Sequence, residues 1–250
     1  MVIKNLLDIL VYKNRKNVKM TWQGGPLKLQ PSFYLYDSKL GNLKIDINSE
    51  KIDYSGGTLV SIYLKKLFAN DFLSREKLTI NPNNSINGHI IETNKEYRKN
   101  NYRFGELIRL LTIAQMNENK SPVFNLVSMN DSIYFHAKYK FLPFIQESDK
   151  LYNVLFSISK DKDRKLENFS NAAKKMLQEY RTLPVTKLNW YNNGNRLVGD
   201  YLNKVLELKL PHEEHKLNTN ISMRLTRKHL LDNKDWFNAL FAKHGIEYQL

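Results

Sequence analysis

The sequence contains no cysteine, and none of its apolar stretches approaches the ~20 residues that cross a bilayer. The first absence excludes disulfides, zinc–thiolate sites, iron–sulfur clusters and cysteine nucleophiles, and nothing points to an oxidising compartment. The second predicts no membrane span. The apolar start of the chain is interrupted by Lys4, Asn5 and Asp8, and no small-residue cleavage site follows it. We therefore expect a soluble, cytoplasmic protein.

Short catalytic motifs are also missing. The chain has no glycine-rich P-loop, no Gly-x-Ser-x-Gly elbow and no dinucleotide-binding Gly-x-Gly-x-x-Gly. His212-Glu213-Glu214-His215 is close to a metal-binding motif, but its histidines are three residues apart rather than four, and no third ligand is apparent. We therefore predict no metal site.

Acidic residues are scarce relative to basic ones. The 25 Asp and Glu face 39 Lys and Arg, which gives a net charge of +14 at pH 7. This charge favours an anionic partner or substrate, such as nucleic acid, acidic lipid headgroups or a phosphorylated cofactor. The alternative is that much of the charge is solvated surface, because a sequence rich in Lys and Asn can carry it without a binding role.

What the chain does contain is typical of a folded globular protein. Hydrophobic residues make up 42% and charged residues 26% of its 250 residues, a length that suits one or two domains. Fourteen Tyr, twelve Phe and three Trp supply large side chains for a packed core. Wholly disordered, collagen-like and coiled-coil classes are therefore poor fits.

Hydrophobic periodicity predicts an α/β protein with a mixed sheet and flanking helices. Helical spacing marks residues 3–12, and we expect strands at 33–36, 43–47, 59–64 and 89–93. A polar, basic turn at 95–103 leads to a helix on which Leu107, Leu110, Leu111 and Ala114 form the apolar stripe, opposite Glu106, Arg109 and Gln115. We then expect a strand at 123–127, a short helix at 132–139 and a strand at 151–158, which together suggest a βαβ crossover.

Beyond residue 160 the pattern becomes helical. A solvated charge run at 161–165 precedes amphipathic helices at 169–180, 197–206 and 236–241, with Pro184 ending the first and Gly245 able to cap the last. The predicted organisation is an N-terminal helix and linker at 1–31, an α/β domain at 32–159 and a helical C-terminal extension at 160–250.

The stretch from 90 to 141 carries a family motif. Its residues are Tyr97-Arg98, Gly105-Glu106 with Leu110, the strand at 124–127, and Ser132, Phe135 and Phe141. In this order they resemble the acyl-CoA-binding core of the GCN5-related N-acetyltransferase (GNAT) superfamily, in a divergent form. The resemblance implies a GNAT-like fold, acetyl-CoA as co-substrate and an amine acceptor, which the net charge suggests is anionic, such as nucleic acid or an acidic protein.

The resemblance also implies where the cofactor would bind. Backbone N–H groups of residues 103–106 would hold the pyrophosphate, and the strand edge at 91–93 would pair with pantetheine. The residues it assigns to the cofactor are Ile91, Thr93, Asn100, Arg103, Phe104, Gly105 and Glu106. A helix entered by a glycine suits this role because its first N–H groups and its dipole bind phosphate oxygens. The alternative is a purely structural turn.

Three residues are candidates for catalysis. Glu92 on the strand is the expected base, and His136 or Tyr139 the expected acid that protonates the leaving thiolate. The alternatives are that Glu92 is only a solvent-facing residue and His136 only a polar residue of a short helix.

The sequence departs from the family pattern at four positions. Asn100 replaces Gln or Arg, Arg103 replaces the first Gly, His136 replaces the usual Tyr, and Lys140 replaces the Gly before Phe141. Arg103 can crowd the close approach that Gly permits, or bind a phosphate itself. A rival interpretation is therefore a GNAT-like protein that has lost the cofactor and binds nucleic acid or acts as an adaptor, with Asn100 and Arg103 as its signature. Basic segments with aromatic residues at 12–16 and 97–103 can contact phosphates, with Tyr stacking on bases, although no nucleic-acid-binding motif organises them. A third interpretation is a hybrid, in which a basic surface brings a charged acceptor to the transferase site.

Overall fold

The computed structural model describes residues 20–21, 32–37, 40–52, 56–66, 69, 71–99, 104–129, 132–182, 187–243 and 248–250. The predicted helix at 3–12, the end of a helix at Pro184 and the cap at Gly245 lie outside these residues, as do Asn100 and Arg103. By its internal packing the chain divides into two compact units, Met1–Phe124 with Thr226–Leu250, and Asn125–Leu225. These units do not follow the boundaries predicted at 31/32 and 159/160.

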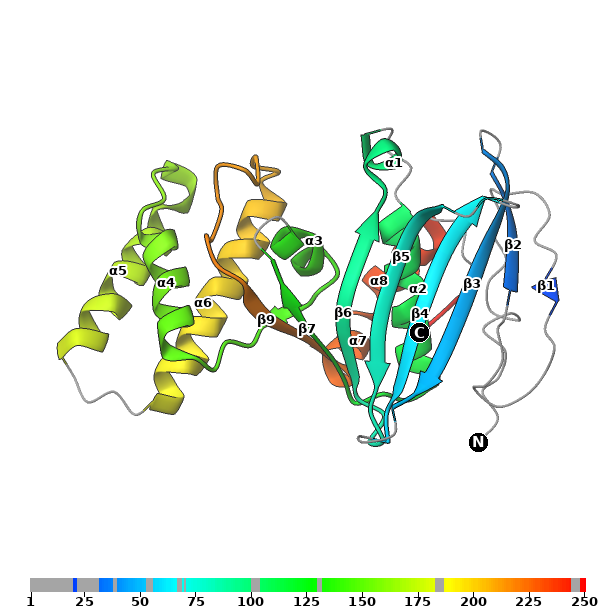
Figure 1. The fold of residues 1–250 in the computed structure, drawn as a ribbon. Coiled ribbons are helices and arrows are strands. Elements are labelled where there is room, and N and C mark those ends of the chain that lie inside the picture. The colour runs from blue at the N-terminus through cyan, green and yellow to red at the C-terminus, as the bar shows by residue number, and fades with distance from the viewer. Residues whose placement is uncertain are drawn as a thin grey trace. The chain divides into compact units, whose positions relative to one another are not determined.

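The first unit is an antiparallel sheet with helices on one side of it (Figure 1). Its strands, in the order in which they pair, are β1 (Met20–Thr21), β2 (Ser32–Asp37), β3 (Gly41–Lys51), β4 (Thr58–Lys66), β5 (Phe72–Ile80) and β6 (Ile86–Thr93). Its helices are α1 (Lys95–Lys99), α2 (Phe104–Glu118), α7 (Arg227–Asp232) and α8 (Lys234–Lys243). The strands predicted at 33–36, 43–47, 59–64 and 89–93 are confirmed.

Alternation along the strands places the core of this unit between the sheet and α2. On β4, Val60, Ile62 and Leu64 are buried while Ser61 and Tyr63 between them are half-buried. The buried side chains face α2, which packs on β4, β5 and β6. α2 is apolar on nearly every side, so it is an interior helix rather than the amphipathic surface helix that its periodicity predicts.

The second unit combines three strands with four helices and a 3-10 turn. In sheet order the strands are β7 (Val123–Ser128), β9 (Ile221–Thr226) and β8 (Leu142–Pro143), and β8 pairs antiparallel with β9. The helices are α3 (Ile133–Lys138), α4 (Ser148–Ser159), α5 (Glu167–Thr182) and α6 (Lys187–Glu207), with the 3-10 turn η2 (Arg164–Leu166) before α5. α4, α5 and α6 pack on one another. A Cβ on Gly194 would lie 2.8 Å from Leu151 Cδ2, so any other residue there would require the Leu151 side chain to shift.

Two expectations for this part of the chain are wrong. The strand predicted at 151–158 is helix α4, in which Leu151, Val154, Leu155 and Ile158 form the buried stripe of a helix. The helical extension predicted at 160–250 contains its three helices, but also strand β9, in which Ile221, Met223 and Leu225 alternate with half-buried residues. The α/β class with flanking helices is confirmed.

No helix within the described ranges combines the length and the apolar character needed to cross a membrane.

Candidate functional site

The carboxyl end of β6 holds the predicted base in an ion pair. Glu92 lies opposite Arg75 on β5, whose Nε donates to Glu92 Oε2 at 2.9 Å and whose Nη2 is 2.8 Å from the same oxygen. The Glu92 side chain is 40% exposed, so it also reaches solvent. Ser74 Oγ donates to the Glu92 carbonyl at 2.8 Å and lies 3.1 Å from Thr93 Oγ1. The strand end that carries Ile91, Glu92 and Thr93 is therefore fixed from one side by β5.

The chain then forms a helix where we expected the strand to continue into a turn. β6 ends at Thr93, and Glu96, Tyr97 and Arg98 belong to α1 rather than to the strand end. Asn94 stops the strand because its side chain accepts the Glu96 N–H at 3.2 Å, as a helix N-cap does. The Tyr97 ring lies 6.1 Å from that of Phe104 and so links α1 to the start of α2.

The first turn of α2 contains the described residues predicted to hold the cofactor phosphates. Phe104 and Glu106 are 1% and 6% exposed, so their side chains belong to the core, and Gly105 between them is half-buried. What this turn can offer to a ligand is its backbone. The amide N–H groups and dipole of a helix N-terminus bind phosphate oxygens, whatever the side chains are. In Figure 1 this turn lies at the same end of the sheet as the carboxyl end of β6.

Beneath that turn, α2 is tied to β5 by a buried charge pair. Arg109 and Glu76 are 2% and 1% exposed, and Arg109 Nη1 lies 2.9 Å from Glu76 Oε1. Thr112 Oγ1 donates to Glu76 Oε2 at 2.6 Å, and the Arg109 guanidinium lies 4.8 Å from the centroid of the Phe124 ring. Burial raises the pKa of Glu76, although the charge of Arg109 and the Thr112 hydrogen bond lower it. The sequence predicts Glu106 and Arg109 on a face opposite the apolar stripe, but the structure buries both side chains with that stripe.

The two predicted acids belong to the second unit, where both are buried among aromatic rings. His136 on α3 is 4% exposed and Tyr139 is fully buried. The His136 ring lies 5.2 Å from that of Phe135 and 5.9 Å from that of Phe141, and the Tyr139 ring lies 5.0 Å from that of Phe135. Neither residue is a surface group, and the role of each stays a prediction.

The backbone after α3 has the conformation that suits the family's glycine. Lys140 has φ of +63°, in the left-handed region that glycine adopts without steric cost. Its N–H bonds to the Ala137 carbonyl at 2.9 Å, and the Phe141 N–H to the His136 carbonyl at 3.2 Å. Lys140 therefore ends the helix in a conformation that a glycine would also adopt.

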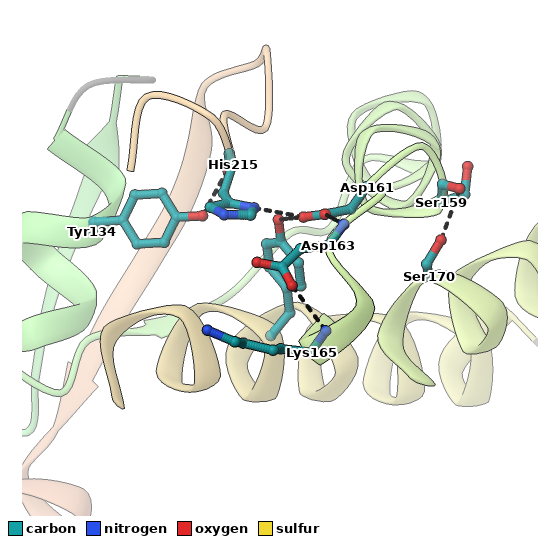
Figure 2. Close-up of polar contacts among 8 residues, drawn as sticks. Tyr134, Ser159, Asp161, Asp163, Lys165, Ser170 and His215 are labelled. Carbon is teal, nitrogen blue, oxygen red and sulfur yellow. Dashed lines mark hydrogen bonds and ion pairs between the residues drawn. The ribbon is translucent and has the colours of Figure 1, made fainter. Parts of the chain in front are cut away.

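A polar cluster that the sequence did not suggest centres on Asp161. Asp161 Oδ2 accepts hydrogen bonds from Tyr201 Oη at 2.6 Å and from His215 Nδ1 at 2.7 Å, and Oδ1 accepts the Asp163 N–H at 2.9 Å (Figure 2). Tyr134 Oη donates to the His215 carbonyl at 2.6 Å. Burial would raise the pKa of Asp161, but the three bonds outweigh it and hold the pKa below its ordinary value. The prediction of a solvated run at 161–165 is wrong for Asp161, whose side chain is 6% exposed.

The two histidines of the His212-Glu213-Glu214-His215 segment have different partners. His215 turns to Asp161, whereas His212 stacks on the Tyr134 ring with centroids 4.3 Å apart. Burial and the nearby charge of His215 lower the pKa of His212. In the part of the chain that the structure describes, no three His, Asp or Glu side chains gather to hold a metal ion.

We expect Asp161→Asn to lower the free energy of unfolding by about 2–3 kcal/mol at neutral pH, because a carboxylate that accepts hydrogen bonds becomes a neutral amide. The pKa of Asp161 is lower in the folded than in the unfolded chain, so the carboxylate contributes stability above its unfolded pKa of about 3.9. That contribution is lost as the pH falls through the folded pKa. Thermal unfolding between about pH 3 and 7 should therefore show the gap between wild type and variant closing below about pH 4. Asp163→Asn is the control, and a gap that stays constant with pH would contradict this role.

The sequence matches no family model, and no curated protein sequence matches it. Among solved structures, it is similar to an acetyltransferase of the GNAT family from Staphylococcus aureus Mu50, with 17% sequence identity and a TM-score of 0.30. The match covers 38% of this chain and 58% of that one. A likeness at this TM-score is too weak to argue from, so the function rests on the chain's own residues.

Proposed function

We propose that this protein transfers an acetyl group from acetyl-CoA to an amine of an acceptor molecule. The observation that carries the proposal is the placement of the first turn of α2 at the carboxyl end of β6, in the order that the sequence motif implies. The left-handed backbone at Lys140, where the motif has glycine, supports the second half of the motif.

The proposed cofactor site uses backbone rather than side chains in its central part. The N–H groups of residues 103–106 would bind the pyrophosphate, and the edge of β6 at Ile91 and Thr93 would pair with pantetheine. Phe104 and Glu106 suit such a site because their side chains are buried, which leaves the approach to the backbone to Gly105. Arg103 and Asn100 would contribute a guanidinium and an amide to the phosphates.

The proposed reaction is direct attack of the acceptor amine on the thioester carbonyl. A nitrogen–carbon bond forms, the carbon–sulfur bond breaks, the amine loses a proton and the thiolate of CoA gains one. Glu92 would take the first proton, since its carboxylate reaches solvent while Arg75 fixes its orientation. His136 or Tyr139 would give the second proton, as the resemblance implies.

Calorimetric titration with acetyl-CoA tests the cofactor site. We expect binding in the micromolar range, and about tenfold weaker binding for Arg103→Glu because its charge reversal repels the phosphates. Lys174→Glu, an equal change of charge on the exposed side of α5, is the control and should bind as the wild type does. The absence of heat with the folded wild-type protein would overturn the transferase proposal and leave the inactive, adaptor-type alternative.

A further inference from the structure

The turn from residue 160 to 165 directs its cations and its carboxylates to different surroundings. Its order is Lys-Asp-Lys-Asp-Arg-Lys, in which two carboxylates would offset half of the four cations. Both carboxylates are bound by the chain itself. Asp161 accepts bonds from Tyr201, His215 and the Asp163 N–H, and Asp163 Oδ1 accepts the Lys165 N–H at 2.8 Å (Figure 2).

The cations of this turn face solvent. Lys160, Lys162, Arg164 and Lys165 are all exposed, whereas Asp161 and Asp163 are not. Among the described residues, no ion pair engages any of the four. Four cations on six consecutive residues, with their acidic neighbours turned to internal donors, form a local positive surface.

An exposed aromatic ring lies beside this surface. Phe156, one turn before the end of α4, is 47% exposed, and the Lys160 ammonium lies 5.1 Å from the centroid of its ring. About half of this apolar ring is therefore open to solvent, next to a cation. Proteins that bind single strands combine cations that follow the phosphates with aromatic rings on which bases stack.

We propose that Phe156 and the turn 160–165 bind single-stranded nucleic acid. The four cations contact phosphates, and the Phe156 ring stacks with a base. The exposed ring favours nucleic acid over an acidic polypeptide, because carboxylates offer charge but no flat base to stack. This proposal goes beyond the acetyl transfer proposed above and does not depend on it.

The test is fluorescence anisotropy with a labelled oligothymidylate, titrated at several salt concentrations. Lys162→Gln with Arg164→Gln should reduce the slope of log affinity against log salt by about 1.4, since each lost phosphate contact on a single strand removes about 0.7. Phe156→Ala should weaken binding by roughly tenfold or more without changing that slope. These positions are exposed, and circular dichroism checks that the variants fold.

The matched control is Lys174→Gln with Lys175→Gln, which removes the same charge from the exposed face of α5. We expect it to leave the slope close to that of the wild type. If both double variants reduced the slope equally, the oligonucleotide would be attracted by the overall positive charge rather than by this turn, and the proposed site would be overturned. Polyglutamate or anionic vesicles that displace the oligonucleotide from the wild type, but not from Phe156→Ala, would assign the surface to those partners and overturn it as well. Failure to bind acetyl-CoA would leave this result unaffected.

Discussion

Arg109→Met is expected to lower the free energy of unfolding by about 3–5 kcal/mol, because it leaves the Glu76 carboxylate buried without its counter-charge. Arg109 and Glu76 are almost fully enclosed between α2 and β5, and the methionine side chain fills space but supplies no donor. Thr112 remains as a hydrogen-bond donor to Glu76. Urea denaturation followed by circular dichroism measures the loss.

A second variant separates the missing partner from a simple packing defect. Glu76→Gln with Arg109→Met removes both charges, so it should cost less than the sum of the two single substitutions by about 1–3 kcal/mol. The control is Lys204→Met, which breaks an ion pair with Glu207 on the exposed side of α6. It should leave the midpoint of the urea denaturation unchanged. Additive losses in the double variant would contradict the account of this pair.

Glu92→Gln is expected to reduce the rate of acetyl transfer by about 10²–10⁴-fold, the usual contribution of a general base. The amide is close to the carboxylate in shape but cannot accept the proton of the attacking amine. The release of free CoA thiol from acetyl-CoA, measured with a panel of amine acceptors, reports the rate. Acetyl-CoA affinity should stay near the wild-type value, since the Glu92 side chain is not among the proposed cofactor contacts.

The control for that variant is Glu50→Gln, which neutralises an exposed carboxylate on β3 of the same sheet. It should retain full activity. A Glu92→Gln protein that transfers acetyl groups at the wild-type rate would show that Glu92 only forms its ion pair with Arg75.

The sequence predicts most elements of the first unit because their burial is one-sided. Strands β3 and β4 alternate between the core and a half-exposed face, so a period of two is visible in their residues. β5 was not recognised because Glu76 occupies a position on its buried face. Its partner Arg109 lies 33 residues further on, and no local pattern indicates that the two charges neutralise each other.

Helix α4 shows why alternation alone misleads in a short segment. Tyr152, Val154, Phe156 and Ile158 alternate like a strand, and yet Val154 and Ile158 also lie one helical turn apart. The structure buries those two on α4 and exposes Phe156. Packing of α4 against α5 and α6 decides between the two periods, and such packing is not visible within eight residues.

For the candidate site, too, the sequence predicts what local order determines and misses what long-range contacts determine. Local order in the sequence predicts Glu92 on a strand, as the structure has it, and Gly105 just ahead of a helix, whereas the structure has Gly105 inside the first turn of α2. In the Asp161 cluster, the partners Tyr201 and His215 lie 40 and 54 positions beyond Asp161 in the sequence. No local pattern shows that they meet, and the sequence therefore predicts a solvated charge run where the structure has a buried acceptor. The assignments of Glu92, His136 and Tyr139 to catalysis stay predictions.

The most direct test of acetyl-CoA binding is a crystal structure of the protein soaked with coenzyme A. We expect the pyrophosphate oxygens to lie within hydrogen-bond distance of the backbone N–H groups of residues 103–106, with pantetheine along the edge of β6. Coenzyme A bound elsewhere, or no density for it at a saturating concentration, would contradict the proposed transferase.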